Sequence, residues 1–468
     1  MTVSLQAYLD NLEEENYELM VGTGDSNALS YGFTKKRAVH PGVSGKMIPP
    51  PMAPQKWVEL MEHEPDMSKK RMVYIHIPFC SHICLYCGFF QNFINEDREQ
   101  RYVERLLKEL EMAKEDKMLQ AKPMQCVFFG GGTPSALSPT NITKVLQKLK
   151  ECIPLTNDCE ITMEARIYDL QKERIEAWFA NGVNRVSIGV QSFDTKIRQA
   201  SGRLDTKETV MERLKLISSY DQASIIVDII FGLPGQTLES FMEDLACIDS
   251  LPISGMDLYQ LNLFSGSPMA KAIQKGSLPP AATRAEQAVM FAAAEKWLND
   301  RGYKRLSNCH WAKDIRERSM YNILAKTGAD VFPFGCGAGG FVGQYSTMQM
   351  RDLEKYITMI DEGKKPIMVM SGKSPYDEVH KKISQNMEQG YLDLRGITAE
   401  NPELVQLEYI LNIWLKNGLM RKGEVMYFQT QAGRFWQNNL TQSLLECCEY
   451  ILSQGKVKEA KPMQGMSA

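Results

Sequence analysis

The sequence lacks the features that would place the chain in a membrane or outside the cell. It has no apolar run of about 18 residues, the length that a membrane-spanning helix needs. Its opening segment, MTVSLQAYLDNLEEENYELM, is acidic and lacks the basic start and apolar core of a signal peptide. An excess of positive charge is also missing, because 54 basic residues face 57 acidic ones. We therefore expect a cytoplasmic protein with neither a nucleic-acid nor a membrane partner.

Cysteine, in contrast, is plentiful, with eleven in 468 residues. In a reducing cytoplasm these residues are not expected to pair as disulfides. Most of them occur singly in apolar or helical contexts, where cysteine behaves as a small buried hydrophobic residue. Three of them are grouped within one short run, and these need another explanation.

Short runs of β-branched and aromatic residues alternate with longer helical patterns from residue 72 onward. Such alternation predicts βα units and a parallel sheet. Six units are too few for a full eightfold barrel, so we predict an α/β fold built on a partial (β/α)6 barrel. The predicted strands are 72–77, 126–129, 159–164, 185–190, 224–230 and 257–263, and the predicted helices between them are 98–117, 141–152, 170–181, 206–219 and 237–248.

Four regions are predicted along the chain. Residues 1–70 form an irregular N-terminal leader and a candidate lid, in which the proline-rich stretch 47–54 cannot be a continuous helix. Residues 71–270 form the partial barrel, and residues 271–370 extend it with a segment on the substrate side. Residues 371–468 form a C-terminal winged-helix-like domain, with a helix at 402–417, two short strands around Gly423 and a helix at 436–452.

The grouped cysteines are Cys80, Cys84 and Cys87, which directly follow the first predicted strand in the run CSHICLYC. A structural zinc site normally has four ligands from paired cysteine or histidine units, and His82 is the only nearby candidate for a fourth. Three thiolates can instead hold an iron–sulfur cube, each on a different iron. One iron then lacks a protein ligand and can bind a substrate. The cluster is our prediction, and zinc is the alternative.

This spacing, after the first strand of a partial barrel, resembles the motif of the radical S-adenosylmethionine (SAM) superfamily. The resemblance implies a [4Fe–4S] cluster on Cys80, Cys84 and Cys87 and SAM bound to the open iron. One electron then cleaves SAM to methionine and a 5′-deoxyadenosyl radical, which the protein must keep dry and directed. An electron donor such as flavodoxin or ferredoxin is an expected partner.

A glycine-rich loop and several polar residues occupy the ends of the later strands. A glycine loop permits close approach of the backbone to a ligand, and a polar residue at a strand end indicates a site. The whole set resembles the coproporphyrinogen-oxidase-like branch of the superfamily, over about residues 70–460. The resemblance implies that SAM contacts Tyr74, Tyr86, Gly131, Gly132, Thr133, Glu164, Gln191, Arg203 and Asp228.

Details of the cysteine loop separate the members of this branch. Phe89 stands where oxygen-independent coproporphyrinogen III oxidases usually have a fourth cysteine, and Gly88 stands where the haem chaperones usually have aspartate. The run 87–92, CGFFQN, resembles the anaerobic haem-degradation enzymes, the anaerobilin synthases, as do 309–311 and 316–322. The resemblance implies radical methylation of haem with opening of the porphyrin ring and release of iron. The oxidase and a non-catalytic haem chaperone are the alternatives.

A haem substrate needs an iron ligand or an apolar slot, and cations for its propionates. His310, beside Trp311, is our candidate haem contact, and Cys336 is a candidate catalytic thiol. Arg316 and Arg318 are candidates for the propionates, since guanidinium pairs with carboxylate. A satisfied core histidine and solvated surface charges are the alternatives. A tetrapyrrole reductase or a haem-delivery protein is a further expected partner.

Overall fold

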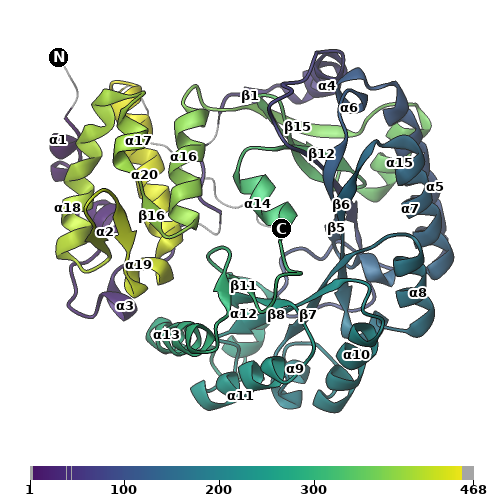
Figure 1. Ribbon diagram of the computed structural model, residues 1–468, viewed down its shortest axis with the longest axis horizontal. Coiled ribbons are helices and arrows are strands. Elements are labelled where there is room, and N and C mark those ends of the chain that lie inside the picture. The colour runs from purple at the N-terminus through teal and green to yellow at the C-terminus, as the bar shows by residue number, and fades with distance from the viewer. Residues whose placement is uncertain (1–3, 38–39, 44, 456–468) are drawn as a thin grey trace.

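The computed structural model describes residues 4–37, 40–43 and 45–455. A single sheet of 13 strands organises the molecule, in the order β1-β15-β14-β13-β12-β2-β5-β6-β7-β8-β9-β11-β10. The sheet curves into a crescent with helices on its outer side and the C-terminal helices facing its hollow (Figure 1). Its two edge strands, β1 and β10, are not paired with each other. The sheet is thus a partial barrel with an open side, as predicted.

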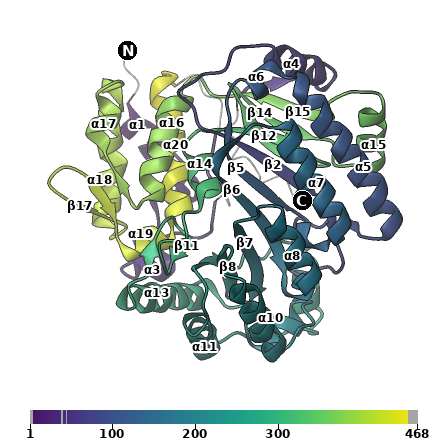
Figure 2. The ribbon, with the colours of Figure 1, turned by 45° about the vertical axis from the view of Figure 1, so that its right-hand side comes forward.

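The predicted strands form the middle of this sheet in sequence order, and each pairs in parallel with the next. Their side chains are buried on both faces, which explains their near-continuous apolar runs. Five predicted helices connect them along the outer side of the crescent (Figure 2). The strands are β2 (Arg71–Ile77), β5 (Met124–Gly131), β6 (Leu155–Arg166), β7 (Arg185–Gln191), β8 (Ser224–Phe231) and β9 (Gly255–Gln260), and the helices are α5 (Glu96–Met112), α7 (Pro139–Cys152), α8 (Lys172–Ala180), α10 (Lys207–Ser219) and α11 (Leu238–Asp249).

A seventh parallel strand, β12 (Asp330–Phe334), lies on the other side of β2 and was not predicted from the sequence. Pro333 interrupts its pattern, because proline cannot donate to a strand ladder. β12 pairs with its antiparallel neighbour β13 at Val331 and Phe341 only. Antiparallel strands complete the two ends of the sheet. They are β13 (Gly339–Val342), β14 (Tyr345–Gln349), β15 (Ile367–Gly372) and β1 (Met47–Ile48) at one end, and β11 (His310–Ala312) and β10 (Lys304–Arg305) at the other.

Helix α14 (Met320–Lys326) lies inside the crescent (Figure 1). It packs on β5 through Tyr321, whose ring centroid is 4.2 Å from that of Phe128. Elsewhere, α13 (Arg284–Asp300) follows the predicted strands in the chain. The remaining elements of the barrel region are α6 (Lys117–Gln120), α9 (Thr195–Ala200), α12 (Pro268–Gln274), α15 (Leu353–Asp361), β3 (Phe79–Cys80) and β4 (Asn92–Phe93). Among the described helices, none is long and apolar enough to cross a bilayer.

The C-terminal region combines helices with a small sheet of order β16-β18-β17. Its two strands around Gly423 and its final helix lie where the sequence predicts them, and residues 456–468 of the predicted domain are outside the described part. The domain boundaries themselves stay predictions. The elements are α16 (Asp377–Glu388), β16 (Tyr391–Leu392), α17 (Leu394–Thr398), α18 (Glu408–Lys416), β17 (Met420–Lys422), β18 (Tyr427–Gln429), α19 (Gln431–Phe435) and α20 (Gln437–Leu452), with a 3-10 turn at Pro402–Leu407.

The leader is not irregular, which corrects the sequence prediction. It contains α1 (Leu5–Asp10), α2 (Glu14–Val21), α3 (Ala28–Tyr31) and α4 (Ala53–Met61). The first three pack on the C-terminal helices, with Tyr8 stacked on Tyr450 at 4.0 Å between ring centroids. These helices are short, so their own periodicity is weak and tertiary packing stabilises them. The proline-rich stretch is broken as predicted, because β1 gives way to a 3-10 turn before α4 begins. A lid role stays a prediction.

Packing of the leader can be tested with Leu9→Ala, because Leu9 is fully buried. A leucine-to-alanine change in a core costs about 2–5 kcal/mol. We expect a clear drop in the melting temperature of the full-length protein. The exposed Glu14 of α2 provides the matched control, Glu14→Ala, which should change it little. Equal melting temperatures for the two variants would contradict the packing described here.

Candidate active site

The three grouped cysteines lie in a loop at the carboxyl end of β2. Cys80 ends the short strand β3, and the amide N–H of Cys87 donates to the carbonyl of Cys84 at 3.1 Å. Cys80 and Cys84 are buried, and Cys87 is half-buried. All eleven cysteines of the chain lie in the described part and are free thiols. The loop therefore presents three thiols at the end of the sheet where parallel-sheet enzymes carry their sites.

The spacing of the sulfur atoms bears on which metal they can hold. One tetrahedral zinc ion brings its sulfur ligands to about 3.8 Å from one another, since each Zn–S bond is about 2.3 Å. In the described part of the chain, only Glu111, Glu151 and Cys152 offer three such ligand atoms within 4.8 Å of one another. The three cysteine sulfurs therefore do not all lie within 4.8 Å of one another, so their arrangement is not that of the ligands of a single zinc ion. A cube that meets each thiolate at a different iron fits it better.

Each of the three sulfur atoms accepts one hydrogen bond. The donors are Thr133 Oγ1 to Cys80 at 3.3 Å, Arg166 Nη2 to Cys84 at 3.2 Å and the Phe89 N–H to Cys87 at 3.2 Å. Such donors stabilise thiolates and tune a cluster. Arg166 also donates to the His82 carbonyl at 2.8 Å. His82 itself is exposed and packs edge-on against Tyr168, with ring centroids 6.1 Å apart.

The pKa values of two of the thiols shift in opposite directions. Burial raises the pKa of Cys80. Burial acts in the same direction on Cys84, but the guanidinium groups of Arg203 and Arg166 outweigh it and lower the pKa of that thiol. Arg166 was not predicted as a site residue, although it follows Glu164 and Ala165 at the end of β6. A polar residue at that strand end was the signal that could have found it.

The glycine loop packs directly against the cysteine loop. A Cβ on Gly132 would lie 2.5 Å from the carbonyl oxygen of Phe79, and one on Gly131 would lie 2.6 Å from the His76 ring. Gly131 also has a φ of 110°, which side chains other than glycine rarely adopt. Only glycine therefore fits at these two positions. Thr133 follows them and is buried where its hydroxyl reaches Cys80.

Tyr74 and His76 line β2 beside this loop. The Tyr74 hydroxyl lies 3.1 Å from His76 Nδ1, and the Tyr102 hydroxyl donates to the His76 carbonyl at 2.5 Å. Burial, with the charge of Arg351, lowers the pKa of His76 to about 4. The imidazole is thus neutral at physiological pH. Tyr74 also joins Phe128 and Tyr321 in an aromatic group, with its ring centroid 6.2 Å and 6.1 Å from theirs.

Glu164 of β6 and Asp228 of β8 lie on the inner side of the sheet. Burial and the nearby charge of Asp228 raise the pKa of Glu164 to about 8. Burial and Asp257, its neighbour across β8 and β9, raise the pKa of Asp228 to about 7. The Ser187 hydroxyl donates to Asp228 at 3.1 Å. These carboxyls can therefore donate as well as accept hydrogen bonds near neutral pH.

Gln191 has the strained backbone and unpaired amide of a ligand-binding residue. Its φ is 72°, and the pairing of β7 with β8 shifts register between Gly189 and Gln191. Its side chain is 8% exposed, yet its Oε1 atom has no hydrogen-bond partner in the described chain. Strain and an orphaned buried acceptor mark functional positions. A ligand with hydroxyl or amino donors, as SAM has, would satisfy this oxygen.

Arg203 connects this position to the cysteine loop. Its Nε donates to the Tyr86 hydroxyl at 2.9 Å, and its Nη1 donates to the Gly189 carbonyl at 2.5 Å. The structure thus places the predicted SAM contacts along one end of the sheet. Gly132 and Thr133 touch the cysteine loop on one side, and on the other side Arg203 contacts Tyr86 of the loop and lies with Gln191 beside Gly189. The residues present fit a cluster with SAM beside it.

His310 pairs across the sheet with Asp257, which in turn pairs with Asp228, but both of its ring nitrogens are engaged. Nδ1 is 2.8 Å from Asp257 Oδ1 and Nε2 is 2.9 Å from Glu317 Oε1, and the side chain is fully buried. In this arrangement His310 has no free nitrogen for haem iron. The geometry favours the alternative of a satisfied core histidine. Arg185 and Ser224 also donate to Glu317, at 3.1 Å and 2.7 Å, and the sequence analysis named neither.

Cys336 is equally unlike a reactive thiol. It is fully buried, its Sγ donates to the Arg351 carbonyl at 3.3 Å, and burial with Glu109 raises its pKa to about 12. Thiols in such settings are inert as nucleophiles. The propionate candidates Arg316 and Arg318 are both exposed, and Arg316 forms an ion pair with Asp221 on the surface. The structure brings neither arginine to the cysteine loop.

The buried His310 network makes the stability of the protein depend on pH. Burial alone lowers the pKa of His310, but Asp257 and Glu317 outweigh it and raise the pKa to about 9. Its stabilising contribution is therefore complete below its unfolded pKa of about 6.5 and is lost as pH rises through 9. We expect the melting temperature to fall between pH 7 and pH 9.5, and His310→Gln to remove part of this fall.

His380→Gln is the matched control, because burial lowers the pKa of His380 to about 4. Its contribution is lost on acidification instead, so this variant should keep the alkaline fall. At pH 7, His310→Gln should cost about 3–5 kcal/mol, since it leaves the buried Asp257 carboxylate without its cationic partner, whereas Glu317 keeps Arg185. An unchanged alkaline slope in His310→Gln would contradict the assignment.

Comparison with known proteins agrees with this geometry. The model of the Radical SAM superfamily matches residues 74–248. Anaerobilin synthase of Escherichia coli O157:H7 is 36% identical over 92% of this chain and 96% of its own length. Heme chaperone HemW of Bacillus subtilis is 27% identical over 79% of this chain and 98% of its own. The structure of coproporphyrinogen III oxidase (HemN) from Escherichia coli matches with a TM-score of 0.71 at 20% identity, over 83% of this chain and 93% of its own, and shows the shared fold. The chain is therefore a radical SAM enzyme with a [4Fe–4S] cluster and SAM as cofactors, and it belongs to the anaerobilin synthase family within the coproporphyrinogen-oxidase-like branch.

Proposed function

We propose that this enzyme methylates haem and opens the porphyrin ring without oxygen, giving a linear tetrapyrrole and free iron. The observation that carries the proposal is similarity to an anaerobilin synthase over nearly the whole chain. The cysteine loop, with its hydrogen-bond donors to the sulfur atoms, supports it. When bound, the cluster and SAM supply a carbon radical that abstracts hydrogen, and SAM supplies the methyl group. The finer specificity, transfer of a methyl group to a haem carbon, belongs to this proposal.

The residues of this chain divide the work at the site. Cys80, Cys84 and Cys87 hold the cluster, and Thr133 and Arg166 donate to two of their sulfurs. On the SAM side, we assign the ribose to Glu164 and a polar end of SAM to the free Gln191 oxygen. Close packing of the glycine loop on the cysteine loop would limit the access of water to the cluster from that side.

A flat, largely apolar substrate fits the segment that follows β9. Leu263 and Phe264 are exposed there by 43% and 51%, and Tyr259, near the end of β9, by 41%. The same segment reaches the cysteine loop, because the Met269 N–H donates to the Leu85 carbonyl at 3.0 Å. Large exposed apolar side chains next to a site mark a surface for an apolar ligand. We therefore propose that haem lies against this segment, with a carbon of its ring facing SAM.

Two alternatives from the same branch are less well supported. An oxygen-independent coproporphyrinogen III oxidase is the first, but Phe89 replaces the fourth cysteine and its side chain is 65% exposed. A haem chaperone is the second, and the HemW relative is less similar than the anaerobilin synthase. Turnover separates the chaperone from the enzyme, because only an enzyme consumes SAM and haem together.

The test of the proposal uses anaerobically reconstituted full-length protein with a reductant, SAM and haem. We expect loss of the haem Soret band, formation of 5′-deoxyadenosine and a methylated, ring-opened tetrapyrrole in the mass spectrum. Cys84→Ala should lose bound iron and all three signals, since a cluster ligand is missing. Cys247→Ala, a half-buried cysteine of α11, is the matched control and should retain them.

Each contrary result points to one alternative. Intact haem with no 5′-deoxyadenosine above a haem-free control, from cluster-loaded protein, would refute the proposal and favour the chaperone. Decarboxylation of coproporphyrinogen III with haem left intact would favour the oxidase. A flavodoxin or ferredoxin can replace the chemical reductant in the same assay, which tests the proposed electron donor. A tetrapyrrole reductase or haem-delivery protein stays a predicted partner.

The SAM assignment has its own test in Glu164→Gln. Glutamine keeps one acceptor oxygen but replaces the other by an NH2 group, so a carboxylate that accepts from both ribose hydroxyls loses one hydrogen bond. That loss costs about 1–2 kcal/mol, so SAM should bind about tenfold more weakly. Asp158→Asn changes an exposed carboxyl on the same strand and should leave SAM binding unchanged. Calorimetric titration of the cluster-loaded proteins measures both. Wild-type affinity in Glu164→Gln would remove Glu164 from the SAM site.

A further inference from the structure

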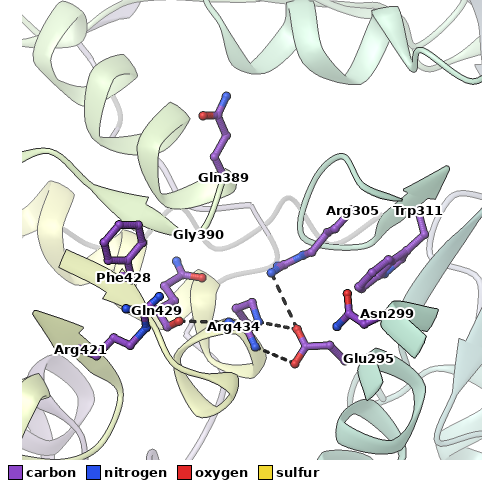
Figure 3. Close-up of a pocket in the computed structure, with 10 residues that line it drawn as sticks. All are labelled: Glu295, Asn299, Arg305, Trp311, Gln389, Gly390, Arg421, Phe428, Gln429 and Arg434. Carbon is purple, nitrogen blue, oxygen red and sulfur yellow. Dashed lines mark hydrogen bonds and ion pairs between the residues drawn. The ribbon is translucent and has the colours of Figure 1, made fainter. Parts of the chain in front are cut away.

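A cavity of about 340 Å³ lies between α13, the strands β10 and β11, and the small C-terminal sheet. Figure 3 shows its side chains converging from these separate elements. Trp311 and Phe428 provide aromatic surface, and the other side chains are mostly polar. The lining residues are Glu295, Asn299, Arg305, Trp311, Gln389, Gly390, Arg421, Phe428, Gln429 and Arg434.

This cavity is separate from the active site. His310 and Trp311 are successive residues of β11, so their side chains point to opposite faces of the sheet. His310 contacts Asp257 and Glu317 on the inner face, and Trp311 lines the cavity. The cavity is therefore on the outer side of the sheet edge, where it joins the barrel region to the C-terminal region.

Positive charge in the cavity is only partly neutralised. Three arginines line it against a single carboxylate, Glu295. Arg434 holds Glu295 with its Nη2 2.8 Å from Oε2, and the Gln431 amide donates to the same oxygen at 3.0 Å. Arg305 Nη1 is left 4.0 Å from Glu295. Burial and the charge of Arg434 lower the pKa of Arg305 to about 10, so another anion there would be stabilising.

Arg421 supplies a second guanidinium for such an anion. Its guanidinium carbon lies 4.6 Å from the Phe428 ring centroid, and it makes no ion pair or side-chain hydrogen bond within the described part of the chain. Stacking on an aromatic ring holds a guanidinium in place and leaves its N–H groups free. A planar fork of donors of this kind suits the oxygens of a phosphate or a carboxylate.

Gln429 adds an acceptor to this group of donors. Its side chain is 2% exposed, and its amide nitrogen donates to the Met387 carbonyl at 2.9 Å. Its Oε1 atom has no partner among the described residues. In Figure 3 the Gln429 amide and the Arg305 side chain point toward each other across the cavity. A buried unpaired acceptor costs about 1–3 kcal/mol, so a ligand that fits here should bring a donor as well as negative charge.

We propose that this cavity binds a phosphate group, either as free hydrogenphosphate or as a small phosphate monoester whose organic part carries a hydroxyl, because the phosphate of a monoester has lost its own protons near neutral pH. A singly protonated phosphate offers anionic oxygens to Arg421 and Arg305 and one O–H to the Gln429 oxygen. The cavity is larger than one phosphate. A water molecule takes up about 30 Å³ of liquid, and a phosphate, with five heavy atoms, takes up only a few times that volume, whereas the cavity measures about 340 Å³. The remaining space beside Trp311 and Phe428 accommodates the organic part of an ester. Bound phosphate would connect the C-terminal region to the edge of the barrel.

Sulfate is the discriminating probe, because it has the size and charge of phosphate but carries no proton near neutral pH. We expect calorimetric titration of full-length protein in phosphate-free buffer to give about tenfold tighter binding of inorganic phosphate than of sulfate. Arg421→Gln should weaken the binding of both anions several-fold. Gln429→Met should abolish the preference for phosphate. Titration with glycerol 1-phosphate then separates the two sources, since its hydroxyls can supply the donor and tighter binding than inorganic phosphate indicates an ester.

Arg395→Gln is the matched control, because Arg395 is an exposed arginine of the same C-terminal region outside the cavity. It should bind phosphate as the wild type does. Equal binding of phosphate and sulfate by the wild type would overturn the proposal, as would equal effects of Arg421→Gln and Arg395→Gln. The wild-type comparison and Arg421→Gln decide the matter even if Gln429→Met does not fold. SAM cleavage by Arg421→Gln should stay at the wild-type rate.

Discussion

Strands β2 and β5 run in parallel from the pair Met72 and Cys126 to the pair Ile77 and Gly131. This pairing brings the end of one strand, which continues into the cysteine loop, beside the end of the other, which continues into the glycine loop. The Gly132 N–H then donates to the Ile77 carbonyl at 2.8 Å and fixes the two loops together. Everything else in the site is placed relative to this contact. A side chain at Gly132 would collide with the backbone of Phe79, so the loops could not close over a cluster.

Burial of charge on the inner face of the sheet has two different outcomes. Toward the strand ends, Glu164 and Asp228 have no cation as close partner, and burial raises the pKa of each. Near the strand starts, Arg185 and His310 neutralise Glu317 in a closed network of ion pairs. The first arrangement leaves polar groups available to a ligand, and the second leaves none. Glu164 and Asp228 thus provide polar groups for a ligand, whereas the ion pairs around Glu317 belong to the structural core of the same barrel.

The C-terminal region and the leader close the open side of the crescent together. The Trp436 indole donates to the Ala28 and Leu29 carbonyls at 3.0 Å and 3.1 Å, which joins α20 to α3. Glu388 accepts from the Asn308 N–H at 2.8 Å and pairs with Lys326 at 2.6 Å, which joins α16 to the segment inside the barrel. Contacts of this kind hold the segment that carries Asn308 and Lys326 against the C-terminal region. The arginine-lined cavity occupies the same seam, where a ligand would affect how the regions meet.

The sequence by itself determined the α/β class, the parallel strands β2, β5, β6, β7, β8 and β9, and the cysteine loop. Hydrophobic periodicity and close residue spacing are local properties, so they can be recognised without a fold. Phe89 and the run around Cys87 also sufficed to select the branch member, through resemblance. The predicted SAM contacts could be assigned to the ends of successive strands for the same reason, because each lies close in sequence to a predicted strand.

Only the tertiary structure decided which polar side chains are free. His310 and Gln191 are both buried, but one has two carboxylate partners and the other has an unpaired oxygen on a strained backbone. β12, the leader helices and the arginine-lined cavity also depend on contacts between residues far apart in the chain. Partners of that kind leave no periodic signal, because burial and hydrogen bonding are set by the whole packing arrangement rather than by neighbouring residues.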